Sequence, residues 1–215
     1  MNDTTLAQRI NVQASQATIP LSVLVELTHR CNLGCYFCYQ KHTRCTGELS
    51  TDSWHDILKQ LVDMGTLYVT LSGGEPFLRK DILRIIGSAR AQDFAVSLIT
   101  NATLVRAATA RKLRDLGVMD VGVSFHAADP ALHDRLTGVA GSFDRALRGL
   151  GNLVSAGIRV LLKHSVSNAN FGEYAALRRL ADKEGCLFEC DSVVVPSRAG
   201  TVSPFALSAE QHETF

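Results

Sequence analysis

Three cysteines in one short loop are the residues of this chain best suited to chemistry. Residues 31–38 read CNLGCYFC, and they follow an apolar run over residues 21–27 that predicts a buried strand. Three thiolates this close together can hold three corners of an iron–sulfur cube, whereas a [4Fe-4S] cluster normally takes four cysteines. The spacing therefore predicts a cluster held by Cys31, Cys35 and Cys38, with its fourth iron open to another ligand.

The residues of this loop alone leave other metal sites open. A structural zinc ion takes four nitrogen or sulfur ligands, so it would need His29, His42 or Cys45 to complete its shell. Cys45 as a fourth thiolate would instead close an iron–sulfur cluster, as in an electron carrier. A disulfide framework requires a secreted protein. Residues 1–18 are polar and lack the apolar segment of a signal peptide, so we expect a reducing, cytoplasmic setting.

A second group of residues with chemical potential is the run Gly73-Gly74-Glu75-Pro76, which follows another apolar stretch. Adjacent glycines allow a sharp turn and a close approach of the backbone to a ligand. Backbone carbonyls together with the Glu75 carboxylate can hold a positively charged amino group. An isolated run of this kind is more often a plain tight turn, and the dinucleotide fingerprint Gly-x-Gly-x-x-Gly is absent.

Apolar, strand-like runs separated by helical patterns must position these groups. Strand–helix alternation with nearly continuous apolar strands is typical of a parallel sheet with helices outside it. Right-handed crossovers would wind such units into an α/β fold, a partial (β/α)6 TIM-like barrel with parallel strands. We expect strands over residues 21–27, 67–71, 95–100, 119–124, 158–166 and 187–195.

Helices are expected between these strands. Ser50 or Thr51 is a good cap for the first of them, and Ser142 is expected to cap a later one that Phe143 anchors. Glycines at several helix ends suit a left-handed cap. We expect helices over residues 51–64, 81–91, 105–116, 142–156 and 170–184, and a further one starting at Ser208.

Composition limits the classes of function. The chain has 215 residues, is 46% hydrophobic and carries a formal charge of +1. It is long enough for one sizeable core, and its balanced charge argues against a nucleic-acid partner. No apolar stretch approaches the ~20 residues of a membrane span. We therefore expect residues 1–20 to form an irregular N-terminal arm and residues 21–215 to form the functional core.

The chain resembles the radical S-adenosylmethionine (SAM) enzymes, whose hallmark is Cys-x3-Cys-x2-Cys with an aromatic residue before the last cysteine, here Phe37. The resemblance implies that Cys31, Cys35 and Cys38 bind a [4Fe-4S] cluster and that the amino and carboxylate groups of SAM chelate the fourth iron. In this family, an electron from the cluster cleaves SAM to methionine and a 5′-deoxyadenosyl radical that abstracts hydrogen from the substrate. A low-potential flavodoxin or ferredoxin would supply the electron.

The same resemblance implies a set of SAM contacts at the ends of successive strands. The run at residues 73–75 matches a Gly-Gly-Glu that contacts the methionyl amino group of SAM. Many relatives place Ser-Leu-Asp-Gly where this chain has Ser124-Phe125-His126-Ala127, so an imidazole replaces the acidic group. The cofactor-binding residues expected from these matches are Phe37, Gly73, Gly74, Glu75, Asn101, Ser124 and His126, and no catalytic acid or base is assigned.

Three further segments are similar to enzymes that modify peptides or mature cofactors: residues 73–79, 99–101 and 133–143. They favour a peptide or peptide-derived substrate. The adjacent His133 and Asp134 are expected to form a structural pair. Relatives usually carry a C-terminal domain with auxiliary clusters, and we expect this domain to be absent or truncated here. The alternatives are a radical SAM enzyme of small-molecule cofactor or tetrapyrrole synthesis, and a non-catalytic iron–sulfur or zinc module.

Overall fold

The computed structural model describes residues 5–40, 47–191, 206–208 and 211. In this part of the chain, six strands form one sheet, and each strand pairs in parallel with the strand that follows it in sequence. This confirms the predicted α/β fold of six parallel strands. The strands are β1 (Ser22–Glu26), β2 (Tyr68–Ser72), β3 (Ala95–Thr100), β4 (Asp120–Ser124), β5 (Arg159–Ser165) and β6 (Leu187–Asp191).

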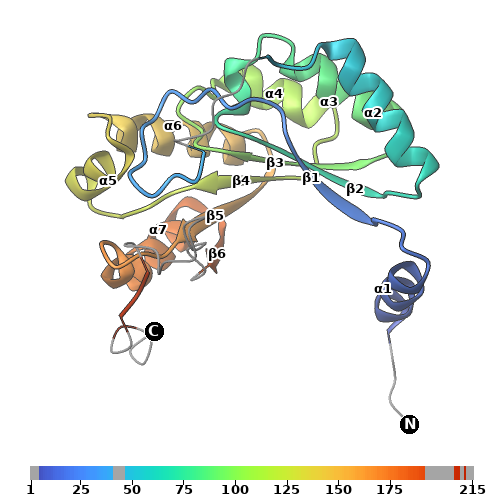
Figure 1. The fold of residues 1–215 in the computed structure, drawn as a ribbon. Helices are drawn as coiled ribbons and strands as arrows, with labels where there is room; N and C mark the ends of the chain where they lie inside the picture. The colour runs from blue at the N-terminus through green and yellow to red at the C-terminus, as the bar shows by residue number, and fades with distance from the viewer. Residues whose placement is uncertain (1–4, 41–46, 192–205, 209–210, 212–215) are drawn as a thin grey trace.

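Helices connect the strands and cover one face of the sheet (Figure 1). Inward-facing residues of the central strands, such as Val69, Leu98, Val123 and Leu162, are fully buried against them. This apolar layer is the core that holds the strands in register. The helices after β1 are α2 (Thr51–Asp63), α3 (Ile82–Ala91), α4 (Ala107–Asp115), α5 (Pro130–Thr137), α6 (Ser142–Ser155) and α7 (Tyr174–Glu184), with short 3₁₀ turns η1 (Pro76–Leu78) and η2 (Phe171–Glu173).

The opposite face of the sheet carries a row of polar side chains across β4, β5 and β6. Register places Ser124 of β4 beside Lys163 of β5, and Lys163 beside Glu189 of β6. The Lys163 ammonium pairs with the Glu189 carboxylate at 2.5 Å. Nonpolar side chains would be expected here if a second layer of helices covered this face. The curved sheet therefore has one covered face and one face that is only partly buried, as in a partial barrel.

Several local expectations were wrong. The arm expected to be irregular contains helix α1 (Leu6–Gln16), which a capping box between Thr5 and Gln8 starts; it stands away from the sheet in Figure 1. Strand β1 is only partly buried, and Leu24 is 54% exposed, because among the described residues β1 pairs only with β2 and forms an edge of the sheet.

Two other differences concern helix boundaries. Helix α5 was not expected, and Asp129 caps it by accepting a hydrogen bond from the backbone N–H of Leu132. Ser142 is not a cap, because Gly141 occupies the capping position of α6. Ser50 does cap α2, as predicted, through a 3.0 Å bond from the Ser53 N–H. The end of the expected strand 187–195 and most of the helix expected from Ser208 fall outside the described residues.

Candidate functional site

The cysteine loop lies directly against the glycine turn after β2. The backbone N–H of Gly74 donates to the carbonyl oxygen of Thr28 at 2.7 Å, and the N–H of Glu75 donates to the carbonyl of Arg30 at 2.8 Å. Both acceptors precede Cys31 in the chain. Parallel strands bring their carboxyl ends to the same edge of the sheet, and these two bonds fix the segment that leads into the cysteines.

Gly73 and Gly74 are required by this close approach of two backbones. A Cβ added to Gly73 would lie 2.4 Å from the Thr28 carbonyl oxygen, and one added to Gly74 would lie 2.2 Å from the Arg30 carbonyl oxygen. Gly73 also has a φ of +139°, a conformation that other residues rarely adopt. The glycines thus let the turn pack on the loop. The contact with SAM that the resemblance implies for them stays a prediction.

The Glu75 carboxylate is fully buried between β2 and β3. It accepts hydrogen bonds from the Thr100 hydroxyl at 2.8 and 2.9 Å, from the N–H of Asn101 at 2.9 Å and from the N–H of Phe77 at 3.1 Å. Burial raises the pKa of Glu75 against the opposing effect of these donors. In this structure, Glu75 ties the glycine turn to the end of β3. The sequence did not reveal that Thr100 takes part in this link.

Asn101 connects the end of β3 to the cysteine loop. Its side-chain amide donates to the Asn32 side-chain oxygen at 3.1 Å and lies 3.8 Å from the Cys31 sulfur. Its own oxygen accepts from the N–H and hydroxyl of Thr103 at 3.0 and 2.6 Å, which fixes the orientation of the amide. The predicted site residue Asn101 therefore does lie beside a predicted cluster ligand.

Helix α5 supports the other side of the loop. The backbone N–H of Gly34 donates to the Thr137 carbonyl at 2.8 Å, and that of Tyr36 donates to the Leu136 carbonyl at 3.1 Å. These carbonyls belong to the last turn of the helix, where they lack partners within the helix. The loop therefore supplies the donors that the end of α5 needs, and α5 in turn holds the loop backbone on both sides of Cys35.

Phe37 lies against the buried His126, which in turn lies against His133. Its ring meets the ring of His126 edge-on at 4.8 Å, and His126 stacks on His133 at 6.0 Å. Burial, together with the nearby His133 and His164, lowers the pKa of His126 to about 3, and burial lowers the pKa of His133 to about 4. Both imidazoles are thus neutral near pH 7. The Nδ1 atom of His126 is buried without a hydrogen-bond partner among the described residues.

The adjacent His133 and Asp134 form a structural pair, as expected: Nδ1 of His133 lies 4.0 Å from the Asp134 carboxylate and 3.1 Å from the Ser142 hydroxyl oxygen. Asp134 accepts hydrogen bonds from the N–H groups of Gly141 and Phe143 at 2.5 and 2.9 Å and from the Ser142 hydroxyl at 2.9 Å. It thereby caps the amino end of α6 from outside that helix. Burial opposes ionisation of Asp134, but these donors outweigh it and keep its pKa below the usual value.

The three cysteines supply a donor set that fits an iron–sulfur cluster. All three belong to the loop described above, with Cys31 exposed and Cys35 and Cys38 partly buried, and thiolates are the usual ligands of such clusters. Over the described residues, no three His, Cys, Asp or Glu side chains converge as a metal site. His42 and Cys45, which a zinc site or closed cluster would need, lie outside these residues.

The polar face of the sheet adds residues that sequence reasoning missed. A Cβ on Gly122 of β4 would lie 2.6 Å from the Lys163 side chain, so Lys163 crosses the strand at this glycine. The predicted site residue Ser124 is in the same row, at the carboxyl end of β4 and partly exposed. A glycine inside a strand was the signal that another group approaches closely there.

Within the described part of the chain, no helix is both long enough and apolar enough to cross a membrane.

Comparison with known proteins identifies relatives. The chain is 35% identical over 164 residues to the Fe-coproporphyrin III synthase of Methanosarcina barkeri, covering 75% of this chain and 41% of the relative. It is 32% identical over 164 residues to the PqqA peptide cyclase of Rhizobium meliloti, covering 75% of this chain and 44% of the relative. The chain thus spans less than half the length of either relative.

Solved structures share the fold. SuiB of Streptococcus suis bound to S-adenosylmethionine matches with a TM-score of 0.78 and 19% identity, covering 97% of this chain and 50% of that chain. SuiB bound to precursor peptide SuiA matches with a TM-score of 0.72 and 21% identity, covering 86% and 42%. The family model of the radical SAM superfamily matches residues 25–172. The chain therefore belongs to the radical SAM superfamily.

Proposed function

We propose that this chain is the core of a radical SAM enzyme that acts on a peptide or a peptide-derived substrate. The observation that carries the proposal is the cysteine loop itself, held at the carboxyl edge of the sheet by the glycine turn after β2 and by Asn101 after β3. Superfamily membership supports the same chemistry. A reducing cytoplasm is the setting that we propose for it.

In this proposal, Cys31, Cys35 and Cys38 hold a [4Fe-4S] cluster. When bound, the cluster supplies the electron that cleaves SAM to methionine and a 5′-deoxyadenosyl radical. Phe37 and His126 offer an apolar edge and a buried neutral imidazole next to the loop, which suits the adenosine part of SAM. Ser124 and the polar row of β4 to β6 face the open side of the sheet, where substrate would lie.

In this proposal, the glycine turn at residues 73–75 contributes to cofactor binding mainly through the position of its backbone. The carboxylate of Glu75 is occupied by Thr100, Asn101 and Phe77. We propose that this turn presents backbone groups to the amino group of SAM, while Glu75 keeps the turn against β3. A low-potential flavodoxin or ferredoxin is the electron donor that we propose, because such clusters need strongly negative potentials.

A peptide substrate is supported by the PqqA peptide cyclase relative, and it agrees with the sequence segments at residues 73–79 and 133–143. A second candidate is the modification of a tetrapyrrole, which the similarity to an Fe-coproporphyrin III synthase favours at comparable identity. Incubation with a linear peptide substrate or with an iron porphyrin, followed by mass spectrometry, separates the two candidates.

The test of the core chemistry is anaerobic reconstitution with iron and sulfide, followed by reduction with dithionite. We expect an EPR signal of a reduced [4Fe-4S] cluster that changes when SAM is added, together with formation of 5′-deoxyadenosine. An EPR signal that does not change when SAM is added, with no 5′-deoxyadenosine formed, would contradict the proposal and favour a closed cluster.

Single substitutions distinguish the proposal from a zinc module. We expect Cys35→Ala to abolish the cluster and His42→Ala or Cys45→Ala to leave the iron content unchanged. Loss of bound metal in the His42 or Cys45 variant would indicate a fourth protein ligand.

A further inference from the structure

The buried guanidinium of Arg79 joins two chain segments that flank the cysteines. Arg79 follows the glycine turn at the end of η1, and it is only 5% exposed. One of its nitrogens donates to the carbonyl oxygen of Leu27, at the end of β1, at 3.1 Å. Another donates to the carbonyl oxygen of Leu49, just before α2, at 3.0 Å. Leu27 precedes the cysteines and Leu49 follows them.

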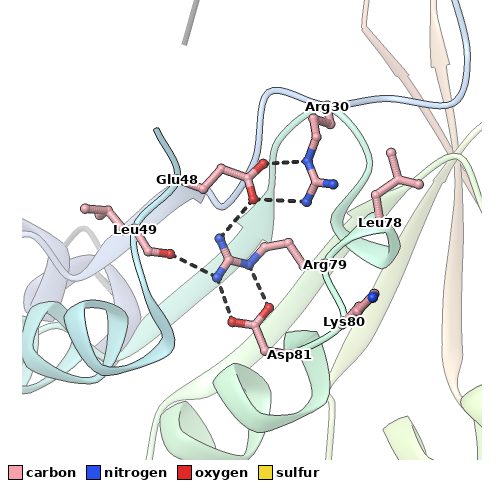
Figure 2. Close-up of a pocket in the computed structure, with 7 residues that line it drawn as sticks. All are labelled: Arg30, Glu48, Leu49, Leu78, Arg79, Lys80 and Asp81. Carbon is pink, nitrogen blue, oxygen red and sulfur yellow. Dashed lines mark hydrogen bonds and ion pairs between the residues drawn. The ribbon is translucent and has the colours of Figure 1, made fainter. Parts of the chain in front are cut away.

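Charged partners fix the orientation of this guanidinium. The Asp81 carboxylate accepts from Arg79 at 3.1 and 2.7 Å in a bidentate arrangement. The Glu48 carboxylate lies 3.6 Å from Arg79 and also binds Arg30 at 2.8 and 3.0 Å. Figure 2 shows Arg79 between Leu49, Glu48 and Asp81, with Arg30 on the far side of Glu48. The planar fork of arginine can hold these groups at once, whereas a lysine ammonium cannot.

Asp81 and Glu48 extend the connection to neighbouring elements. Asp81 accepts a 2.6 Å hydrogen bond from the hydroxyl of Thr51, the first residue of α2. Glu48 accepts a hydrogen bond from the hydroxyl of Thr28. The backbone before the cysteines is therefore joined to the backbone after them and to the start of α2. The buried guanidinium of Arg79 and the carboxylates of Asp81 and Glu48 make this connection.

We propose that Arg79 is a positioning residue for the cluster: its guanidinium clamps the segments before and after the cysteines, so that the loop is held in shape before a cluster binds. The effect on the cluster rests on the proposed function, whereas the clamp itself is a property of the chain without cofactor. None of the hydrogen bonds and ion pairs of the Arg79 side chain described above involves a cysteine or an expected SAM contact, so its action on the cluster passes through the backbone.

The experiment compares Arg79→Gln with the matched variant Arg114→Gln. Arg114 makes an exposed ion pair with Asp115 on α4, and Arg114→Gln removes the same type of group from an ion pair that does not involve the cysteine loop. Hydrogen exchange of the chain without cluster is followed at the amides of Gly34 and Tyr36, which bond to the end of α5. Amides of the β3–β4 pairing serve as the reference for global unfolding.

We expect Arg79→Gln to speed exchange at Gly34 and Tyr36 by at least about 10-fold, since it removes charge-assisted hydrogen bonds. Exchange in β3 and β4 should change much less, and Arg114→Gln should match the unsubstituted chain. After reconstitution, Arg79→Gln should lose iron to a chelator about 10-fold faster. Arg79→Lys keeps the charge but not the planar fork, so its exchange rates and its rate of iron loss should lie between those of Arg79→Gln and those of the unsubstituted chain.

Unchanged exchange at Gly34 and Tyr36 would overturn the proposal. An equal acceleration throughout the sheet would also overturn it, because Arg79 would then stabilise the whole fold and not the loop. Faster loop exchange with normal iron retention would show that the clamp does not serve the cluster. If the unsubstituted chain takes up no cluster at all, the proposed function fails, while the exchange data still decide whether Arg79 holds the loop.

Discussion

Replacing Gly74 by alanine tests how the glycine turn supports the cysteine loop. The new Cβ would stand 2.2 Å from the Arg30 carbonyl oxygen, and real Cβ contacts essentially never fall below 3.0 Å. One of the two backbones must therefore move by most of an ångström. That movement strains the hydrogen bonds from Gly74 to Thr28 and from Glu75 to Arg30, which measure 2.7 and 2.8 Å.

The size of the effect follows from these contacts. Overpacking of a rigid contact costs about 1–3 kcal/mol, and the partial weakening of the two backbone hydrogen bonds adds about 1 kcal/mol in total. We expect Gly74→Ala to lower the free energy of unfolding by about 2–4 kcal/mol. The displaced segment leads into Cys31, so we also expect less iron to be retained after reconstitution.

The free energy of unfolding is measured by urea unfolding followed by circular dichroism, and the retained iron is measured by iron analysis. Gly151→Ala is the matched control, because Gly151 lies inside α6 and an added Cβ meets nothing within 4 Å. Alanine is favoured over glycine in a helix by about 0.5–1 kcal/mol, so the control should gain stability. If Gly74→Ala unfolds at the same urea concentration as the control and keeps its iron, the steric argument is wrong.

Three further outcomes follow from the buried polar groups. Glu75→Gln would place an amide donor against the Thr100 hydroxyl and the Asn101 N–H. We expect calorimetry without SAM to show that the free energy of unfolding falls by about 1–3 kcal/mol. An effect seen only in the KM for SAM would argue for a purely ligand-binding role. Asp134→Ala removes the cap of α6 and should cost about 1–2 kcal/mol, measured as a lower urea midpoint; an unchanged midpoint would contradict the capping role. Burial keeps the pKa of His126 at about 3, below the 6.5 of an exposed histidine, so the unfolded chain binds the extra proton and stability falls as the pH drops below about 6.5. His126→Gln should flatten this dependence by about 1.4 kcal/mol per pH unit, and an equal slope in both proteins would refute a neutral buried imidazole.

Much of the fold could be predicted because its signals are local. Apolar runs placed five strands and the start of β6 within a few residues, and Ser50 starts α2 while Gly185 ends α7, as their types suggest. Helix α1 was missed because its signal is a capping box with few apolar residues behind it. The exposure of β1 was missed because a sequence does not state which strand has only one neighbour.

The candidate site was predictable in its sulfur donors and less so in the roles of their neighbours. Spacing alone singled out the three cysteines, and strand ends singled out Asn101, which lies beside Cys31. The use of Glu75 as a buried link to Thr100, and of Arg79 as a link between Leu27 and Leu49, depends on side-chain packing across distant segments. No local pattern encodes such partners.

The sequential order of the sheet also has a consequence for how the protein assembles during synthesis. Each strand joins a partner that has already left the ribosome, so the sheet can grow from its first edge without waiting for distant segments. The supports from Gly74, Arg79 and Asn101 are translated early, but Gly34 and Tyr36 bond to carbonyls at residues 136 and 137. The start of the cysteine loop can therefore be anchored before α5 is synthesised, and the hydrogen bonds that hold Gly34 and Tyr36 can form only after that helix has been made.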